Sequence, residues 1–407
     1  MNLTPTAVGL GAGCWLVWAR SRVGRLFHMA GRAPSSVVRP SLVSQTCVRF
    51  TEHRSHVPLA LGAAPWIVLW AKMGAMEPLQ IGCLGAARIA PAALIKPSAA
   101  NEGVVCAAVA ARDPRRAEKF AAKHHIAKVH ESYDALLADD ELDAVYNPLP
   151  NGLHGVWTLR ALARGKHVLC EKPFTANAEE AQRVADAAAD SGLVAMEAFH
   201  WRYHPMAARM LEVIGSGELG EVRRIEAALC FPLPRFKDIR WQLPLAGGAL
   251  MDAGCYPVHM VRTLAGEEPT VTRAVAKLHS AGVDRRMEAE FSFADGRTGG
   301  ILASMWSSTL LRFRVVVTGS LATMRVLNPT TPHMFNRLSV SGAKGRRHER
   351  VAGGPTYDYQ LEAFRAAVQE GTPSLTPPSD AVANMRVIDA IYLAAGLEAR
   401  PAAKEAA

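Results

Sequence analysis

The sequence predicts an α/β protein with a doubly wound parallel sheet in its N-terminal half and a large, mostly antiparallel open sheet in its C-terminal half. Residues 79–199 alternate short apolar segments with helical patterns, and a turn of small residues follows the first apolar segment. Beyond about residue 210, apolar and polar residues alternate with a period of two. Strands joined by helical crossovers form parallel sheets, whereas a period of two marks half-buried strands.

The N-terminal half contains five predicted strands. They are residues 79–84, 104–110, 144–146, 167–170 and 193–199. Helices are expected from Pro91 onward, at 114–125, at 132–138 and at 156–164. Asn177 can cap a further helix because Glu180 follows three positions later, and Gly192 can end it.

The C-terminal half is predicted to be one large sheet followed by two helices. Met287, Ala289, Phe291 and Phe293 alternate with polar residues, which indicates a strand buried on one face. Similar segments occur at 225–229, 271–278, 301–306, 313–317 and 323–327. The closing helices are expected at 357–368 and 380–397.

The net charge of +9 is concentrated at the N-terminus. Residues 1–76 hold eight Lys/Arg against one acidic residue, Glu52, whereas the remainder holds 38 basic and 36 acidic residues. Binding to a nucleic-acid backbone requires a basic surface on the folded body. We therefore expect no nucleic-acid partner.

This N-terminal leader contains two apolar stretches, one up to Trp18 and one from Val57 to Trp70. Both are shorter than the roughly 20 residues of a membrane-spanning helix. We expect a disordered or spurious extension, Met76 as the working start, and no membrane association. A single N-terminal anchor is the alternative.

The seven cysteines are scattered, odd in number and never in C-x-x-C spacing. Most lie in apolar segments, where a free thiol behaves as a small hydrophobic side chain. This pattern favours a reducing compartment, the cytoplasm, and argues against a zinc or other metal site.

The segment QIGCLGAARIA, residues 80–90, reads as strand, tight turn and helix. Gly85, Ala87 and Ala90 stand where a dinucleotide-binding turn has its three small residues, because the backbone must approach a pyrophosphate at a helix N-terminus. The predicted contacts are Gly85, Ala87, Arg88 and Ile89. Two of the glycines are replaced by alanine, so an ordinary tight turn is the alternative.

The end of the second strand indicates which cofactor binds. An acidic residue there holds the ribose 2′-hydroxyl of NAD, whereas an arginine accommodates the 2′-phosphate of NADP. Ala111 stands at the expected acidic position and Arg112 follows it. NADP is therefore the predicted cofactor, with NAD possible, and a solvated loop arginine is the alternative for Arg112.

The segment VLCEKPF, residues 168–174, ends a predicted parallel strand with Glu171-Lys172-Pro173. A lysine there points into the crevice where ligands of such sheets bind. Together with GxxGAARIA, VYNPLPNGLH (145–154), GGALMDAGCYPVHMVR (247–262) and MEAFHWRYHP (196–205), this motif resembles the Gfo/Idh/MocA family. The resemblance covers about residues 77–397 and points to the branch of dimeric dihydrodiol dehydrogenases and NADP-dependent xylose dehydrogenases.

The resemblance implies a Rossmann domain at 77–200, a substrate-binding and oligomerisation domain at 201–397, and a flexible tail at 398–407. It also implies that Lys172 is the catalytic lysine, with Asp252 as the acid and Tyr256 as the proton-transfer residue. Asp252 and Tyr256 are four residues apart and share a helical face. We expect the Lys172 ammonium to lower the pKa of the Tyr256 phenol, which would make it a base. The alternatives are a helix cap for Asp252 and a core aromatic for Tyr256.

Other residues are assigned with the same motifs. Asn151, His154, Glu171 and Lys172 are expected beside the cofactor. Trp201, Tyr203, Asp252 and His259 are expected to bind substrate. Interdomain packing is the alternative for Trp201 and Tyr203, while His259 is either an acid/base in place of Tyr256 or a packed helical histidine.

These observations predict an oxidoreductase that transfers a hydride between NADP and a hydroxyl-bearing carbon of a sugar, polyol or trans-dihydrodiol. A homodimer or homotetramer is expected, because in this family the open sheet commonly forms the oligomer interface. The competing interpretation is a non-catalytic NAD(P)-binding regulator or scaffold of the same fold.

Overall fold

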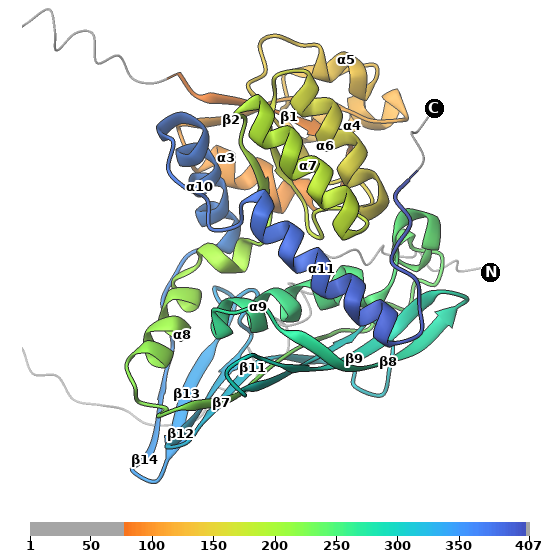
Figure 1. The fold of residues 1–407 in the computed structure, drawn as a ribbon. Helices are drawn as coiled ribbons and strands as arrows, with labels where there is room; N and C mark the ends of the chain where they lie inside the picture. The colour runs from red at the N-terminus through yellow and green to blue at the C-terminus, as the bar shows by residue number, and fades with distance from the viewer. Residues whose placement is uncertain (1–76, 404–407) are drawn as a thin grey trace, which may run out of the picture. The chain divides into compact units, whose positions relative to one another are not determined.

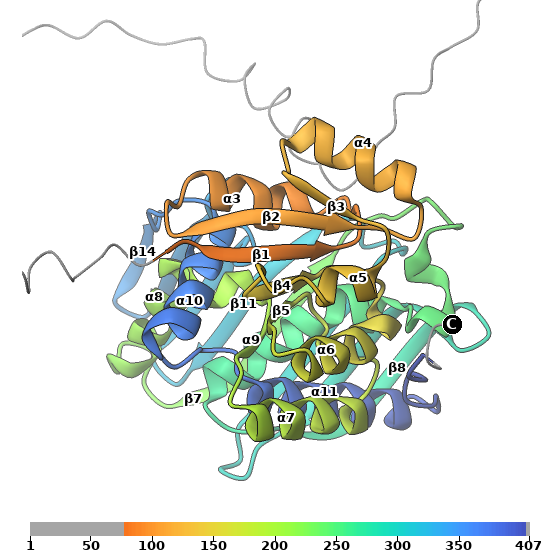
Figure 2. The same ribbon diagram turned by 90° about the horizontal axis from the view of Figure 1, so that it is seen from above.

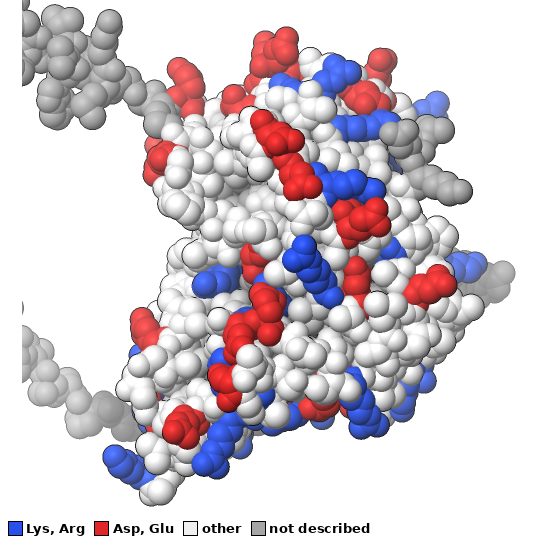
Figure 3. All heavy atoms as spheres, in the orientation of Figure 1, with Lys and Arg blue, Asp and Glu red and all other residues white. Residues whose placement is uncertain are grey.

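The structure, a computed structural model, describes residues 77–403, and from Pro78 onward the chain forms one compact unit (Figure 1). The predictions for the leader at 1–76 lie outside the described residues. Among the described residues no helix is long and apolar enough to cross a membrane. On the face in Figure 3, acidic and basic side chains are interspersed.

The first sheet has six strands, and each pair of neighbours is parallel. Its order is β3-β2-β1-β4-β5-β6. The strands are β1 (Leu79–Leu84), β2 (Val104–Ala110), β3 (Lys128–His130), β4 (Ala144–Asn147), β5 (His167–Cys170) and β6 (Ala195–Glu197). The order reverses between β1 and β4, and ligands of open α/β sheets bind at the carboxyl ends of the strands beside such a reversal.

The predicted helices of this half are present, with ends within two residues of the predicted ones, and η2 was not predicted. The helices are η1 (Pro91–Ile95), α3 (Lys96–Ala99), α4 (Pro114–His124), α5 (Tyr133–Leu137), η2 (Asn151–Leu153), α6 (His154–Ala163) and α7 (Ala178–Ser191). The Asn177 side chain accepts a hydrogen bond from the Glu180 amide at 2.9 Å, and Gly192 ends α7 at φ +67°. Asn177 and Gly192 therefore act as the predicted caps.

The second sheet has eight strands in the order β14-β13-β12-β11-β7-β10-β9-β8. They are β7 (Val222–Cys230), β8 (Thr270–Ser280), β9 (Val283–Ser292), β10 (Thr298–Ser304), β11 (Arg312–Gly319), β12 (Ala322–Leu327), β13 (Arg337–Gly342) and β14 (Gly345–Glu349). Only β7 and β10 pair in parallel, so the sheet is mostly antiparallel as predicted. Strands β3, β13 and β14 were not predicted: β3 is short, β14 has no apolar alternation, and in β13 only Leu338 and Val340 alternate with polar residues.

Among the described residues, helices cover one face of the eight-stranded sheet and none lies on the other (Figures 1 and 2). The helices after β6 are η3 (His200–Tyr203), α8 (Pro205–Gly215), η4 (Ile239–Trp241), η5 (Leu243–Leu245), η6 (Leu250–Gly254), α9 (Cys255–Ala265), α10 (Thr356–Glu370) and α11 (Pro378–Ala394). Helix α9 packs on β7 and β10, while α11 packs against α7, α9 and β8. Helix α10 returns to the first half and packs against η1 and α3.

Candidate active site

Lys172 follows β5 and precedes a cis peptide bond to Pro173. Its side chain is 14% exposed and reaches across to η6, where Nζ donates a hydrogen bond to the Asp252 carbonyl oxygen at 3.0 Å. Nζ also lies 3.7 Å from the Asp252 carboxylate and 5.0 Å from the centre of the Tyr256 ring. The structure therefore brings the three predicted catalytic residues together.

Asp252 is held between two cations. Its Oδ1 lies 2.9 Å from Arg240 Nε and 3.7 Å from Lys172 Nζ. Burial raises the pKa of the carboxyl, but Arg240 and Lys172 outweigh it, so the net pKa is lowered. Burial likewise lowers the pKa of Lys172, and the charge of Asp252 reverses this, so its net pKa is raised. Both groups are therefore charged at neutral pH.

Arg240 belongs to a chain of ion pairs along the loop after β7. Arg240 Nη1 lies 3.1 Å from Asp238, whose other oxygen lies 3.6 Å from Arg88 in the turn after β1. The Asp238 side chain is only 4% exposed, and it also accepts a hydrogen bond from the Arg240 amide. Arg88, Asp238, Arg240 and Asp252 thus form a row of alternating charges that runs from the turn after β1 to Lys172.

Tyr256 lies in the first turn of α9 and is 6% exposed. Its hydroxyl is 2.9 Å from Nε2 of His200, and its ring meets Phe199 edge to face with centroids 5.5 Å apart. Burial, together with the neighbouring acidic groups, raises the pKa of the phenol well above its usual value. The predicted lowering of this pKa is therefore wrong, because the cost of burying a phenolate exceeds the help from Lys172.

The turn after β1 suits a pyrophosphate. Gly85 has φ +102°, and a Cβ there would meet Leu149 at 3.4 Å, so a side chain would be strained and crowded. The amides of Arg88 and Ile89, just before η1, have no hydrogen-bond acceptor among the described residues. Free amides at the start of a helix bind phosphate oxygens, so Arg88 and Ile89 could hold a pyrophosphate, whereas the Ala87 amide already donates to the Gly85 carbonyl.

Arg112 lies just beyond the end of β2 and is exposed. One turn into α4, Arg116 donates a hydrogen bond from Nη2 to the Ala86 carbonyl at 2.9 Å. The buried side chain of Ala111 packs with Ala86 and Ala117. Two arginines thus follow the carboxyl end of β2, the region in which folds of this kind bind the ribose 2′-phosphate.

Three other residues that were predicted to contact the cofactor have hydrogen-bond partners within the protein. His154 is 1% exposed, with its ring nitrogens 2.7 Å from the carbonyls of Pro173 and Leu149. Glu171 is buried and accepts a hydrogen bond from Tyr146 at 2.7 Å. Asn151 donates to the Ala246 carbonyl at 3.3 Å. His154 and Glu171 therefore support the turn that carries Lys172.

The predicted substrate residues other than Asp252 are buried in packed networks. Trp201 is fully buried, and its Nε1 donates to His259 Nδ1 at 3.1 Å. His259 Nε2 is 2.8 Å from Asp380, and its ring stacks on Phe199. The Tyr203 hydroxyl meets Ser374 and Thr376 at 3.0 and 2.7 Å. These contacts favour the packing alternatives for Trp201, Tyr203 and His259.

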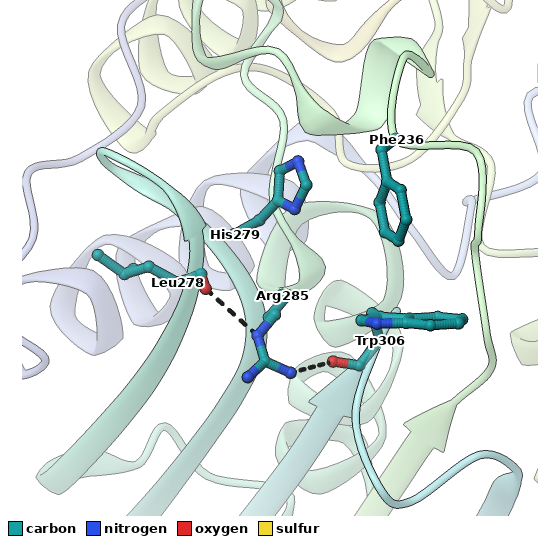
Figure 4. A pocket seen from close by; sticks show the side chains of 5 residues that line it. All are labelled: Phe236, Leu278, His279, Arg285 and Trp306. Atoms are coloured by element: carbon teal, nitrogen blue, oxygen red, sulfur yellow. Dashed lines mark hydrogen bonds between the residues drawn. The ribbon is translucent and has the colours of Figure 1, made fainter.

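A pocket of about 330 Å³ opens between the loop after β7 and the ends of β8, β9 and β10 (Figure 4). Phe236 stacks on His279 with centroids 5.5 Å apart and meets Trp306 edge to face at the same distance. Arg285 closes the floor by donating to the carbonyls of Leu278 and Trp306 at 3.2 and 2.7 Å. The pocket is thus an aromatic-lined hollow on the loop that carries Arg240.

Three residues of the site escaped the sequence analysis as functional contacts: His200, Asp238 and Arg116. His200 precedes Trp201 in the motif MEAFHWRYHP and was a detectable candidate. Arg116 lies in the first turn of the predicted helix at 114–125, close in sequence to Arg112, and was therefore also a detectable candidate. Nothing in the local sequence indicates that Asp238 pairs with Arg88.

A dinucleotide turn facing a buried lysine, carboxylate and phenol defines a pyridine-nucleotide-dependent oxidoreductase. Comparison with protein families agrees. Residues 79–199 match the oxidoreductase family with an NAD-binding Rossmann fold, and residues 207–325 match the GFO/IDH/MocA C-terminal domain. The chain belongs to the Gfo/Idh/MocA oxidoreductase family.

Individual relatives have names in the same class. The chain is 39% identical over 316 residues to D-xylose 1-dehydrogenase (NADP(+)) 2 of Haloferax volcanii, covering 77% of this chain and 96% of that protein. It is 36% identical over 205 residues to a trans-1,2-dihydrobenzene-1,2-diol dehydrogenase of Mus musculus, covering 49% of this chain and 60% of that protein.

Solved structures share the fold. A 3-ketoreductase from Actinomadura kijaniata in complex with NADP and TDP-benzene superimposes with a TM-score of 0.74 at 28% identity. The match covers 78% of this chain and 98% of that chain. The predicted family, its two-sheet architecture and its oxidoreductase class are therefore confirmed.

Proposed function

We propose that this chain is an NADP-dependent oxidoreductase that transfers a hydride between the nicotinamide and a hydroxyl-bearing carbon of a sugar, polyol or trans-dihydrodiol. One observation carries the proposal: Lys172, Asp252 and Tyr256 converge beyond the carboxyl end of β5, on the side of the sheet where the turn after β1 suits a pyrophosphate. The named activities of the relatives from Haloferax volcanii and Mus musculus support the substrate class.

Gly85, Arg88 and Ile89 would hold the pyrophosphate, and Arg112 and Arg116 would hold the 2′-phosphate. When bound, the nicotinamide supplies a carbon that accepts or donates the hydride. The Lys172 ammonium donates a hydrogen bond to the substrate oxygen and stabilises the charge that develops there. Asp252 keeps that ammonium protonated and aimed, and Tyr256 exchanges the proton of the substrate hydroxyl.

The activity is tested by mixing the protein with NADP and a panel of aldoses, polyols and trans-dihydrodiols and following absorbance at the wavelength of NADPH. Turnover of at least one class is expected. Tight NADP binding without turnover across the panel, in either direction, would favour the regulator or scaffold instead.

The cofactor assignment has a separate test. Arg112→Ala should raise the KM for NADP by about 10-fold or more and leave the KM for NAD nearly unchanged, because one charge-assisted phosphate contact contributes about 1.5–3 kcal/mol. The matched control is Arg350→Ala, at an exposed arginine far along the chain. Equal effects on both cofactors would refute the assignment.

We further propose a division into domains at about residue 200, a homodimer or homotetramer formed through the helix-free face of the eight-stranded sheet, and a cytoplasmic location. The sheet face carries exposed apolar side chains such as Val275 beside ion pairs such as Arg224–Glu290. The five cysteines among the described residues are free thiols, four of them buried, which suits a reducing compartment.

A further inference from the structure

His200 offers Tyr256 a second proton-transfer partner. The two side chains are 2% and 6% exposed, and His200 Nε2 lies 2.9 Å from the Tyr256 hydroxyl. Nδ1 of His200 is buried and has no hydrogen-bond partner among the described residues. If the Tyr256 hydroxyl donates to Nε2, a neutral ring carries its own proton on Nδ1. Nε2 of the imidazole then accepts a hydrogen bond from Tyr256, and the N–H group at Nδ1 is a donor that has no acceptor among the described residues.

Two further histidines, His204 and His333, influence the ionisation of His200. Burial first, and then the charges of Lys172, His333 and His204, lower the pKa of His200 to about 3. His204 Nε2 and His333 Nδ1 are also buried and unpaired among the described residues, and His333 is itself only partly buried. Buried unpaired nitrogens of this kind are usually satisfied by ordered water. An ordered water beside the unpaired Nδ1 of His200 would give that nitrogen a partner and could accept its proton.

We propose that His200 is a catalytic proton relay for Tyr256, an inference that rests on the proposed function. During oxidation the substrate O–H bond breaks and its proton binds the Tyr256 oxygen, while the proton of Tyr256 passes to Nε2 of His200. The Nδ1 proton of His200 leaves to water. The two electrons of the substrate C–H bond leave as hydride to the oxidised nicotinamide, so one carbonyl and one released proton result; reduction reverses every step.

The relay removes a difficulty in the site. Tyr256 is buried, and its raised pKa makes a phenolate costly at neutral pH. Lys172 Nζ hydrogen-bonds Asp252 and lies over the Tyr256 ring, 5.0 Å from its centre. If Tyr256 receives the substrate proton while it gives its own proton to His200, no phenolate forms at any stage. The Tyr357 ring lies against His200, with centroids 4.3 Å apart, and burial and the charges of Lys172, His333 and His204 keep the pKa of His200 low. The imidazole therefore works by exchanging tautomers and stays uncharged.

The test uses His200→Ala, which leaves a cavity that imidazole can enter, and His200→Gln, which fills the site but cannot pass a proton. Both should lower kcat by about 100-fold, the lower end for general acid–base catalysis, with the Kd for NADP unchanged. Added imidazole should restore His200→Ala at least 10-fold and leave His200→Gln and the exposed control His348→Ala unaffected. If either His200 variant keeps turnover within threefold of the wild type, or imidazole restores nothing, the relay is refuted.

A second measurement separates this inference from the proposed function. Nitrogen-15 NMR of the protein without substrate should show His200 neutral at pH 7 with its proton on Nδ1. A charged ring, or a proton on Nε2, would overturn the relay even if turnover is found. If the wild type turns over no substrate of the panel, the proposed function fails. The NMR measurement of the His200 tautomer then still shows whether Nε2 is free to accept a proton from Tyr256.

Discussion

At the residue scale, the site depends on one ammonium that is buried and yet charged. Lys172 keeps its proton because the Asp252 carboxylate lies 3.7 Å from Nζ and the Asp252 carbonyl accepts its hydrogen bond. The charge that Lys172 carries after β5 is therefore held in position by a residue of another element, Asp252 of η6. An uncharged side chain of similar shape would preserve the packing but could not stabilise the charge that develops on the substrate oxygen.

Lys172→Met should lower kcat/KM by at least about 100-fold, the cost of removing one donor from a developing oxyanion. The Kd for NADP, measured by fluorescence titration, should change by less than about threefold because the phosphate contacts remain. Lys344→Met, in the exposed turn between β13 and β14, is the matched control. A Lys172→Met enzyme with normal turnover would disprove the catalytic role.

Asp252 gives a prediction for the pH profile. Without Arg240 the burial of this carboxyl is less compensated, so its pKa should rise. The carboxylate is then protonated at a higher pH, and the acidic limb of kcat/KM should shift upward in Arg240→Met, by about one unit for each 1.4 kcal/mol of lost interaction. An unshifted limb in Arg240→Met, compared with Arg350→Met, would show that Asp252 does not control the profile.

At the element scale, α9 and α11 are joined by a buried polar cluster. Asp380, in the first turn of α11, accepts hydrogen bonds from His259 at 2.8 Å and from Arg262 at 3.0 Å. Burial raises the pKa of Asp380, but these partners outweigh it and lower the pKa to about 2. A folded-state pKa below the unfolded value of about 3.9 stabilises the fold above that value, and the contribution is lost as the pH falls toward 2.

Asp380→Asn should therefore lower the free energy of unfolding by about 2.5 kcal/mol at pH 7, from a shift of nearly two pKa units. Near pH 2 the variant and the wild type should be almost equally stable. Urea unfolding at both pH values tests this, with the exposed Asp190→Asn on α7 as the control. A difference of the same size at pH 2 would mean that packing, and not charge, joins the helices.

The elements differ in how well local sequence predicts them. Helix α7 was predicted at both ends, because Asn177 and Gly192 act on their own chain neighbours. Strand β14 carries Arg346, Arg347 and His348 and no apolar alternation, so only its pairing with β13 makes it a strand. The same distinction holds in the site: the motif predicted Lys172, whereas the environment of Tyr256, and hence its raised pKa, depends on residues far away in the chain.

At the scale of the whole molecule, the alternation of strands with helices and the period of two predicted the two sheets. Neither pattern predicted how the C-terminal helices pack on the rest of the chain. Helix α10 returns to pack against η1 and α3, and α11 bridges α7 and β8. These contacts join the first half to the C-terminal elements, and no local pattern specifies them. The eight-stranded sheet remains covered on one face alone, and its other face combines apolar and charged side chains.

That face provides the final prediction. Leu302 lies near the middle of the sheet on β10, directly opposite Glu288 of β9, and points to the side away from Ile301 and Ala303, which are buried under α9. Leu302→Lys places an ammonium beside Glu288, so the monomer should fold normally while a partner sheet would have to bury an extra charge. Light scattering after size-exclusion chromatography should show the wild type as a dimer or tetramer and the variant shifted toward monomer. Leu393→Lys, 65% exposed on α11, should leave the assembly intact; a wild-type monomer, or an unshifted Leu302→Lys, would place the contact elsewhere.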